Sequence, residues 1–118
     1  MNTAAIQRFD VGPRMSEMAV HHGTIYLAGQ VAEDSSADIA GQTRQVLDAI
    51  DHLLARAGSD RSKILRAEIF LPDMTDFAAM NAVWEAWVIA GHTPPRATVQ
   101  AQLAKPEWKI EIVITAAV

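Results

Sequence analysis

Apolar residues recur at spacings of three and four between Ile39 and Ala57, and this period predicts an amphipathic helix. Ser35 or Ser36 can cap its N-terminus, and Gly58 is the expected C-terminal stop. The predicted core-facing stripe consists of Ile39, Val46, Leu47, Ile50, Leu53, Leu54 and Ala57.

A second, shorter helix is predicted over residues 76–88, with Asp73 or Thr75 as its cap. Asn81 falls within its apolar stripe. An amide in such a place is either buried and bonded to nearby backbone or part of a site, and the pattern leaves both interpretations open. The stripe consists of Phe77, Met80, Trp84, Trp87 and Val88.

Alternation of apolar and polar residues predicts strands before, between and after these helices. Gly23 marks a tight turn between the second and third strands, and we expect the last two strands to form a hairpin around residues 104–108. The order β-β-β-α-β-α-β-β predicts an α+β fold, a mixed sheet with both helices on one face, in a single domain over residues 1–118. The predicted strands cover residues 6–9, 16–22, 24–31, 64–71, 96–103 and 109–116.

The last two strands place candidate polar side chains on one face of the predicted sheet. We assign Ala97 and the apolar residues that alternate with it to the core, which leaves Arg96 and Thr98 outside the core, with Glu111 on the last strand. In a hairpin that pairs Gln102 with Glu111, Arg96 and Glu111 would lie on the order of 20 Å apart. One small ligand could then touch both side chains only where two chains pack together.

The non-core face is also expected to be partly apolar, because Tyr26, Ala28, Phe70 and Val113 fall on it. The composition agrees, since 50% of the 118 residues are hydrophobic and only 20% are charged. We therefore expect part of the surface to be covered by another subunit.

The composition excludes several function classes. The chain has no cysteine, which excludes disulfides and thiolate chemistry, and no two histidines share a helix face, so we expect no metal site. The net charge of -4 and the scattered cations argue against nucleic-acid binding. No apolar stretch is long enough to span a membrane and no signal-peptide pattern precedes the first strand, so the expected location is cytoplasmic.

Taken singly, the candidate residues are ambiguous. The planar fork of Arg96 suits a carboxylate, but an exposed arginine at a strand end is common. Glu111 can equally be a solvated strand residue, and Gly29 is a lone glycine where a backbone N–H could meet a ligand. The residues by themselves indicate an oligomer with a possible carboxylate site between chains, and no reaction.

Several short motifs, in their order and spacing, resemble the YjgF/RidA (Rid) family of imine deaminases, and the YoaB-like branch in particular. The resemblance implies a chorismate-mutase-like fold and a homotrimer with sites between subunits. It also implies hydrolysis of 2-imino acids, formed from 2-aminoacrylate or 2-aminocrotonate, to 2-keto acids and ammonia, with no cofactor. The motifs are Gly12-Pro13, residues 24–30, residues 76–81, residues 95–99 and residues 109–112.

The resemblance also implies roles for individual residues. Arg96 matches the arginine that binds the substrate carboxylate, and Glu111 matches the glutamate that positions or activates water. The substrate-binding candidates are Gly29, Asn81, Ala97 and Thr98, the last standing where archetypal members often have cysteine.

The chain departs from the archetype in two places. Arg14-Met15 stands where a tyrosine follows Gly-Pro, and Ala28 stands where a serine precedes the loop glycine. A non-catalytic trimer that binds small carboxylates is the alternative function. A nuclease or translation inhibitor is a third interpretation, disfavoured by the charge.

Overall fold

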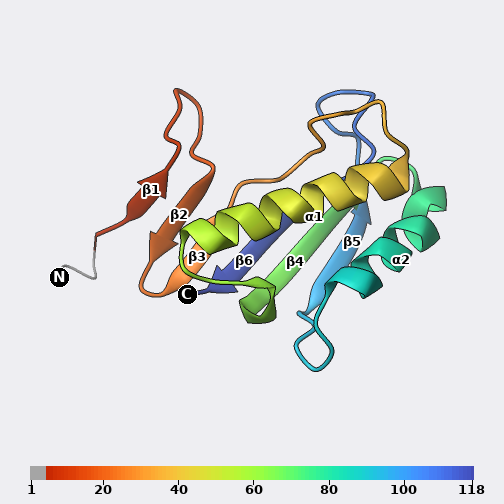
Figure 1. The fold of residues 1–118 in the computed structure, drawn as a ribbon. Coiled ribbons are helices and arrows are strands. Elements are labelled where there is room, and N and C mark those ends of the chain that lie inside the picture. Colours follow the sequence, from red (N-terminus) through yellow and green to blue (C-terminus); the bar gives the residue numbers. More distant parts are fainter. Residues whose placement is uncertain (1–4) are drawn as a thin grey trace.

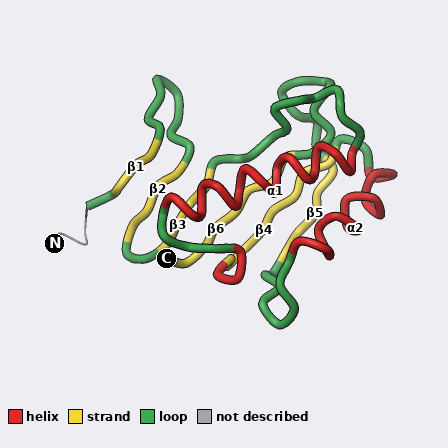
Figure 2. Tube along the Cα trace, in the orientation of Figure 1, coloured by secondary structure: helices red, strands yellow, loops and turns green. Residues whose placement is uncertain are grey.

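The computed structural model describes residues 5–118 and shows one six-stranded sheet in the order β1-β2-β3-β6-β4-β5 (Figures 1 and 2). The predicted succession of helices and strands is confirmed, with two short 3-10 turns added. The elements are β1 (Gln7–Phe9), β2 (Met18–His21), β3 (Thr24–Leu27), α1 (Ile39–Arg56), η1 (Arg61–Lys63), β4 (Ile64–Leu71), η2 (Met74–Asp76), α2 (Phe77–Trp87), β5 (Arg96–Gln100) and β6 (Glu111–Ala117).

Both helices cover the same face of the sheet, as predicted (Figure 1). The predicted stripe of α1 forms much of the core, where Val46, Leu47, Ile50 and Leu54 pack with the inward side chains of β4 and β6. The molecule is a thin slab of 47 × 38 × 20 Å, because none of residues 5–118 covers the other face of the sheet. Among the described residues no helix is long and apolar enough to cross a membrane.

The first predicted hairpin is confirmed. His22 and Gly23 have φ values of 50° and 77°, the paired left-handed conformations of a two-residue hairpin turn. They join β2 to β3 in a register that pairs His21 with Thr24.

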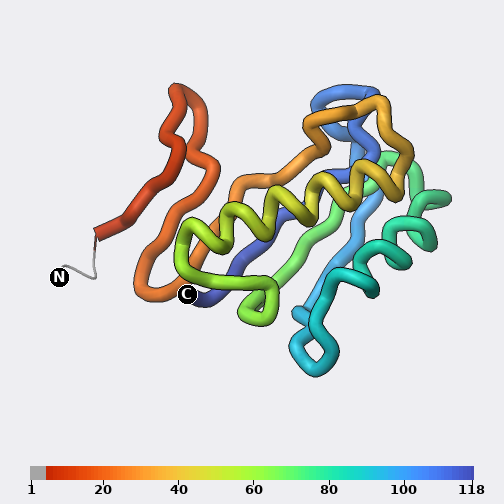
Figure 3. Tube along the Cα trace, in the orientation of Figure 1, coloured from red at the N-terminus to blue at the C-terminus, as the bar shows by residue number. Residues whose placement is uncertain are grey.

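The second predicted hairpin is wrong. β6 does not pair with β5; it lies between β3 and β4, antiparallel to both, whereas β5 runs parallel to β4 at the edge (Figure 3). Residues 101–110 form a connection long enough to pass over the end of β4. A turn signal shows that a chain reverses, but it does not show which strand the returning segment joins.

Local details at three element boundaries also differ from expectation. Asp38, not Ser35 or Ser36, caps α1, and its side chain accepts a 2.8 Å hydrogen bond from the Gly41 N–H. A register shift between Ile64 and Arg66 at the start of β4 leaves Leu65 49% exposed, so the alternation expected of a strand does not hold there. Asp73 caps the 3-10 turn η2 and not α2 as predicted: its side chain accepts a 2.9 Å hydrogen bond from the Thr75 N–H, whereas Asp76 at the N-terminus of α2 makes no side-chain capping bond.

Candidate functional site

Glu111 and Gly29 are in direct contact at the start of β6. A methyl group built on Gly29 would lie 2.1 Å from the Glu111 carboxylate oxygen Oε2 and 2.8 Å from its Cδ. Only glycine leaves room for the carboxylate in this position, since every other residue carries a Cβ. The structure therefore joins two of the predicted site residues that lie 82 positions apart.

The loop that carries Gly29 is held against β6 by backbone hydrogen bonds. Gln30 donates to the Ile112 carbonyl at 2.9 Å, and Ile112 donates to the Gln30 carbonyl at 3.1 Å. The Gln30 side chain donates at 3.2 Å to Glu17, which ties the loop to the residue that precedes β2. These bonds fix the approach of Gly29 to Glu111.

Arg96 lies on the helix side of the sheet, and its predicted placement outside the core face is wrong. It pairs in register with Ala67, which is fully buried under the helices, and paired residues on adjacent strands share a face. Ala97 and Val99 consequently lie on the outer face, where Val99 is 48% exposed. Alternation separates the two faces of a strand, but at an edge strand over an apolar outer face it does not say which one is inward.

The guanidinium of Arg96 lies over two aromatic side chains of α2. Its Cζ is 5.5 Å from the ring centre of Trp84 and 5.9 Å from that of Phe77. Within residues 5–118 it makes no ion pair and no hydrogen bond. The sequence placed Phe77 and Trp84 only in the core stripe; their seven-residue spacing was the signal that they could flank one side chain.

The other candidates sit close to Arg96 along the chain or on α2. Asn81 lies between Phe77 and Trp84 on α2 and is half-buried, and its side chain makes no hydrogen bond with the described residues. Thr98 shares the helix side with Arg96, and its hydroxyl is buried without a partner among the described residues. Ala97 is exposed and faces the other way.

Arg96 and Glu111 do not meet within one chain. Arg96 pairs with Ala67 and Glu111 with Phe70, so they are offset along β4, and that strand lies between them. Strand geometry puts their Cα atoms on the order of 14 Å apart. Their side chains also leave opposite faces, since Glu111 lies on the outer face with Phe70. The hairpin from which we predicted their separation does not form, but Arg96 and Glu111 are nevertheless apart within one chain.

The structure has a small cavity beside Arg96 and a larger one between the two helices. The smaller, about 130 Å³, is formed by Arg66, Pro95, Arg96 and Ala97. It is below the roughly 300–1,000 Å³ of typical ligand pockets, so one chain alone offers an incomplete enclosure beside Arg96.

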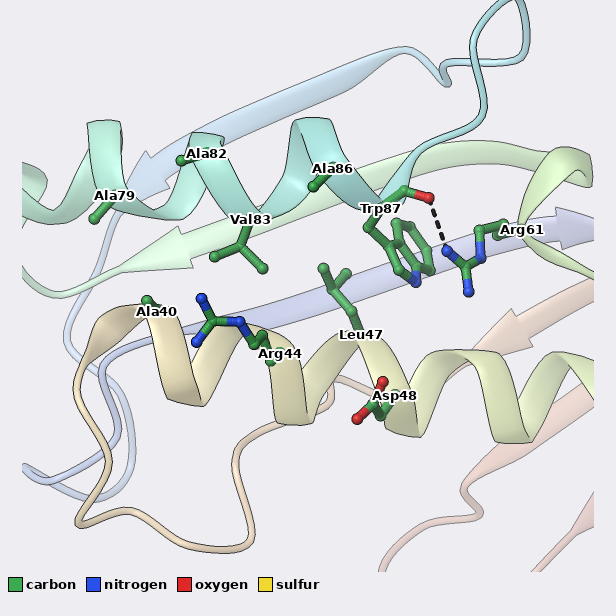
Figure 4. Close-up of a pocket in the computed structure, with 10 residues that line it drawn as sticks. All are labelled: Ala40, Arg44, Leu47, Asp48, Arg61, Ala79, Ala82, Val83, Ala86 and Trp87. Atoms are coloured by element: carbon green, nitrogen blue, oxygen red, sulfur yellow. Dashed lines mark hydrogen bonds between the residues drawn. The ribbon is translucent and has the colours of Figure 1, made fainter.

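The larger cavity, about 610 Å³, is a groove between α1 and α2 (Figure 4). It contains none of the predicted site residues and lies on the other flank of α2 from Arg96. Its walls are Ala40, Arg44, Leu47 and Asp48 of α1, Arg61, and Ala79, Ala82, Val83, Ala86 and Trp87 of α2.

The outer face of the sheet is partly apolar, as predicted. Tyr26 is 51% exposed there, and the register places Phe70, Val113 and Val99 on the same face. Exposed apolar patches occur at surfaces that contact a protein, a membrane or a ligand. No three His, Cys, Asp or Glu side chains among residues 5–118 cluster closely enough to hold a metal ion.

Known proteins are similar to this chain over nearly its whole length. A family profile described as endoribonuclease L-PSP matches residues 5–118. The chain is 50% identical over 113 residues to the RutC family protein YoaB of Escherichia coli, covering 96% of this chain and 98% of that protein. It is equally similar, at 50% over 113 residues, to a RutC family protein of Haemophilus ducreyi, covering 96% and 97%.

A solved structure shows the same fold. The crystal structure of a YjgF family member from Neisseria meningitidis superposes with a TM-score of 0.95 at 49% identity, covering 98% of this chain and 97% of that one.

Proposed function

Because the chain belongs to the YjgF/RutC/Rid family, with its chorismate-mutase-like α+β fold, we propose that it is a deaminase that hydrolyses 2-imino acids to 2-keto acids and ammonia. One observation carries this proposal beyond the family. The Arg96 guanidinium and the Glu111 carboxylate have no charged partner among the described residues. The guanidinium lies over the Trp84 ring, and the carboxylate packs against Gly29.

In the proposed reaction Arg96 binds the substrate carboxylate through its planar fork of N–H donors. Glu111 accepts a proton from water, whose oxygen attacks the imine carbon. The proton passes to the imine nitrogen, which gives a carbinolamine; Glu111 then transfers the hydroxyl proton to the same nitrogen, and the carbon–nitrogen bond breaks as the carbonyl forms and ammonia leaves. The substrate site is lined by Gly29, Asn81, Ala97 and Thr98. The imine carbon is already electrophilic, so positioning and proton transfer are sufficient, without a metal or organic cofactor.

We propose that the site is completed by a neighbouring chain in a homotrimer. Arg96 of one subunit then faces Glu111 and Gly29 of the next, which resolves the separation of the two groups within a chain. The apolar outer face with Tyr26, Phe70 and Val99 supplies surface for such an assembly.

The test is release of 2-ketobutyrate from enzymatically generated 2-iminobutyrate. We expect the protein to accelerate release and Arg96→Ala to lose most of the effect, because the carboxylate anchor is gone. Ala82→Leu narrows the larger groove between the helices and is the matched control, with activity unchanged. Equal activity of wild type and Arg96→Ala would contradict the assignment, and loss in Ala82→Leu would move the site to the groove.

The alternative is a trimer that binds small carboxylates without turnover. It predicts saturable binding of 2-ketobutyrate in calorimetry with no acceleration of imine hydrolysis. A nuclease role is disfavoured by the net charge of -4, and gel-shift assays with RNA at moderate salt test it directly.

A further inference from the structure

Two tryptophans of α2 each lie against an arginine from another element, and the two pairs differ in one respect. Arg61 lies 5.1 Å from the Trp87 ring centre, and Arg96 lies 5.5 Å from that of Trp84. Both tryptophans are nearly buried, at 8% and 6% exposed. The two pairs therefore form an internal comparison.

The guanidinium of Arg61 is bonded to two other parts of the protein. It donates to Asp51 Oδ2 at 2.8 Å and to the Trp87 carbonyl at 2.9 Å. The Trp87 indole donates to the same Asp51 oxygen at 3.0 Å. Arg61 thus closes a structural network that ties η1 to α1 and α2.

The guanidinium of Arg96 is held in place, but its hydrogen-bond donors are unused by the described residues. Two rings, Phe77 and Trp84, lie within 6 Å of it, yet none of its N–H groups donates to a described residue. A ring attracts a cation through its π face and leaves the N–H edge free. A guanidinium placed in this way can bind a carboxylate through two parallel hydrogen bonds.

Helix geometry explains why two rings reach one guanidinium. Seven residues separate Phe77 from Trp84, nearly two full turns, so they lie one above the other on the same face of α2. Ala82 and Ala86, which line the larger groove, project from the other side of the helix. The face that meets Arg96 is the aromatic one.

We propose that Phe77 and Trp84 are positioning residues that hold the Arg96 guanidinium with its N–H edge free for the substrate carboxylate. The expected change in KM rests on the proposed function. The expected change in binding affinity requires only that a 2-keto acid binds at Arg96.

The experiment replaces each ring and separates binding from chemistry. We expect Trp84→Leu and Phe77→Leu to raise KM for the imino acid by roughly three- to tenfold, with kcat changed less than about twofold, because only the carboxylate anchor is loosened. Trp84→Phe keeps a ring and is expected to stay near wild type. Phe77 is 37% exposed, so Phe77→Leu preserves the test where Trp84→Leu fails to fold.

Trp87→Phe is the matched control, since it alters an equally buried tryptophan of α2 that stacks on the other arginine. We expect its KM to be unchanged. An unchanged KM in both leucine variants would overturn the proposal, and so would an equal rise in Trp87→Phe, which would indicate a general effect on the helix.

Calorimetric titration of the same variants with 2-ketobutyrate distinguishes this proposal from the proposed function. A wild-type protein that binds the keto acid without turning over imine refutes the deaminase. Weaker binding in the leucine variants would still support the positioning role. A wild-type protein that neither binds nor turns over would overturn both.

Discussion

At the scale of single residues, Arg96 and Glu111 are each half-buried without a charged partner among residues 5–118. Three other arginines of the chain make ion pairs, with Asp10, Asp51 and Glu68. A partly desolvated charge without a partner costs stability, and proteins retain such groups mainly where they serve a ligand.

Gly29→Ala tests whether the position of the Glu111 carboxylate matters. The new Cβ would overlap Oε2 and Cδ of Glu111, so the carboxylate must rotate away. We expect turnover to fall by roughly a hundredfold, because small misplacements of a catalytic group are costly. The free energy of unfolding should change by less than about 1 kcal/mol, since a flexible side chain can yield.

Glu111→Gln is the companion variant for this experiment. It removes the charge without the overlap, and we expect a similar loss of turnover with normal keto-acid binding. Full activity in Gly29→Ala would show that the observed position of the carboxylate is irrelevant to the reaction.

Asp10 provides a test of pH dependence. Its carboxylate accepts hydrogen bonds at 2.6 and 3.0 Å from Arg56, and these bonds, with the attraction of the two charges, lower the pKa of Asp10 below its ordinary value of 3.8. The pair therefore contributes its full stability above pH 3.8 and loses it as the pH falls through the lower, folded-state pKa.

Asp10→Asn is the suitable variant, because asparagine tolerates the φ of 56° at this position. Urea unfolding should show the variant less stable than wild type at neutral pH, with the difference vanishing in strong acid. If the difference in stability between variant and wild type persists unchanged in strong acid, the ion pair is not its source.

At the scale of elements, patterns of periodicity located both helices and all six strands, and the errors fell at their ends and edges. Whether a residue caps a helix depends on backbone angles that hydrophobic spacing does not encode. For α1 two serines and Asp38 were all chemically competent. The structure selects Asp38 because its extended backbone aims the carboxylate at the Gly41 N–H.

The cap prediction is tested by Asp38→Ala against Ser36→Ala. We expect Asp38→Ala to lower the free energy of unfolding by about 1 kcal/mol, through loss of the cap. Ser36→Ala should cost less than about 0.5 kcal/mol, since its hydroxyl donates only to the exposed Asp34. Thermal or urea unfolding of both proteins decides, and equal losses would contradict the assignment of the cap.

At the scale of the whole molecule, the decisive feature is that the two parts of the proposed site lie on opposite faces of one sheet. Gly29 and Glu111 form one half, and Arg96 with the aromatic face of α2 forms the other. Neither half can reach the other within the chain, so the proposed activity is a property of the assembly.

Complementation between inactive variants tests this directly. Arg96→Ala and Glu111→Gln are each expected to be nearly inactive. After mixing in denaturant and refolding together at equal amounts, about a quarter of the sites would combine an intact Arg96 with an intact Glu111 and recover activity. The same variants refolded separately and then mixed are the control. No recovery in co-refolded samples would place both groups in one subunit's site or refute the pairing.

The amino-acid sequence by itself determined the elements and their order, because hydrophobic period and turn chemistry act over a few residues. It also singled out Arg96 and Glu111 through the residues around them. Only the tertiary structure decided that β6 inserts between β3 and β4 and that Arg96 turns toward α2. Strand pairing and the inward face depend on contacts between segments far apart in the chain, and alternation along one strand is the same whichever face is buried.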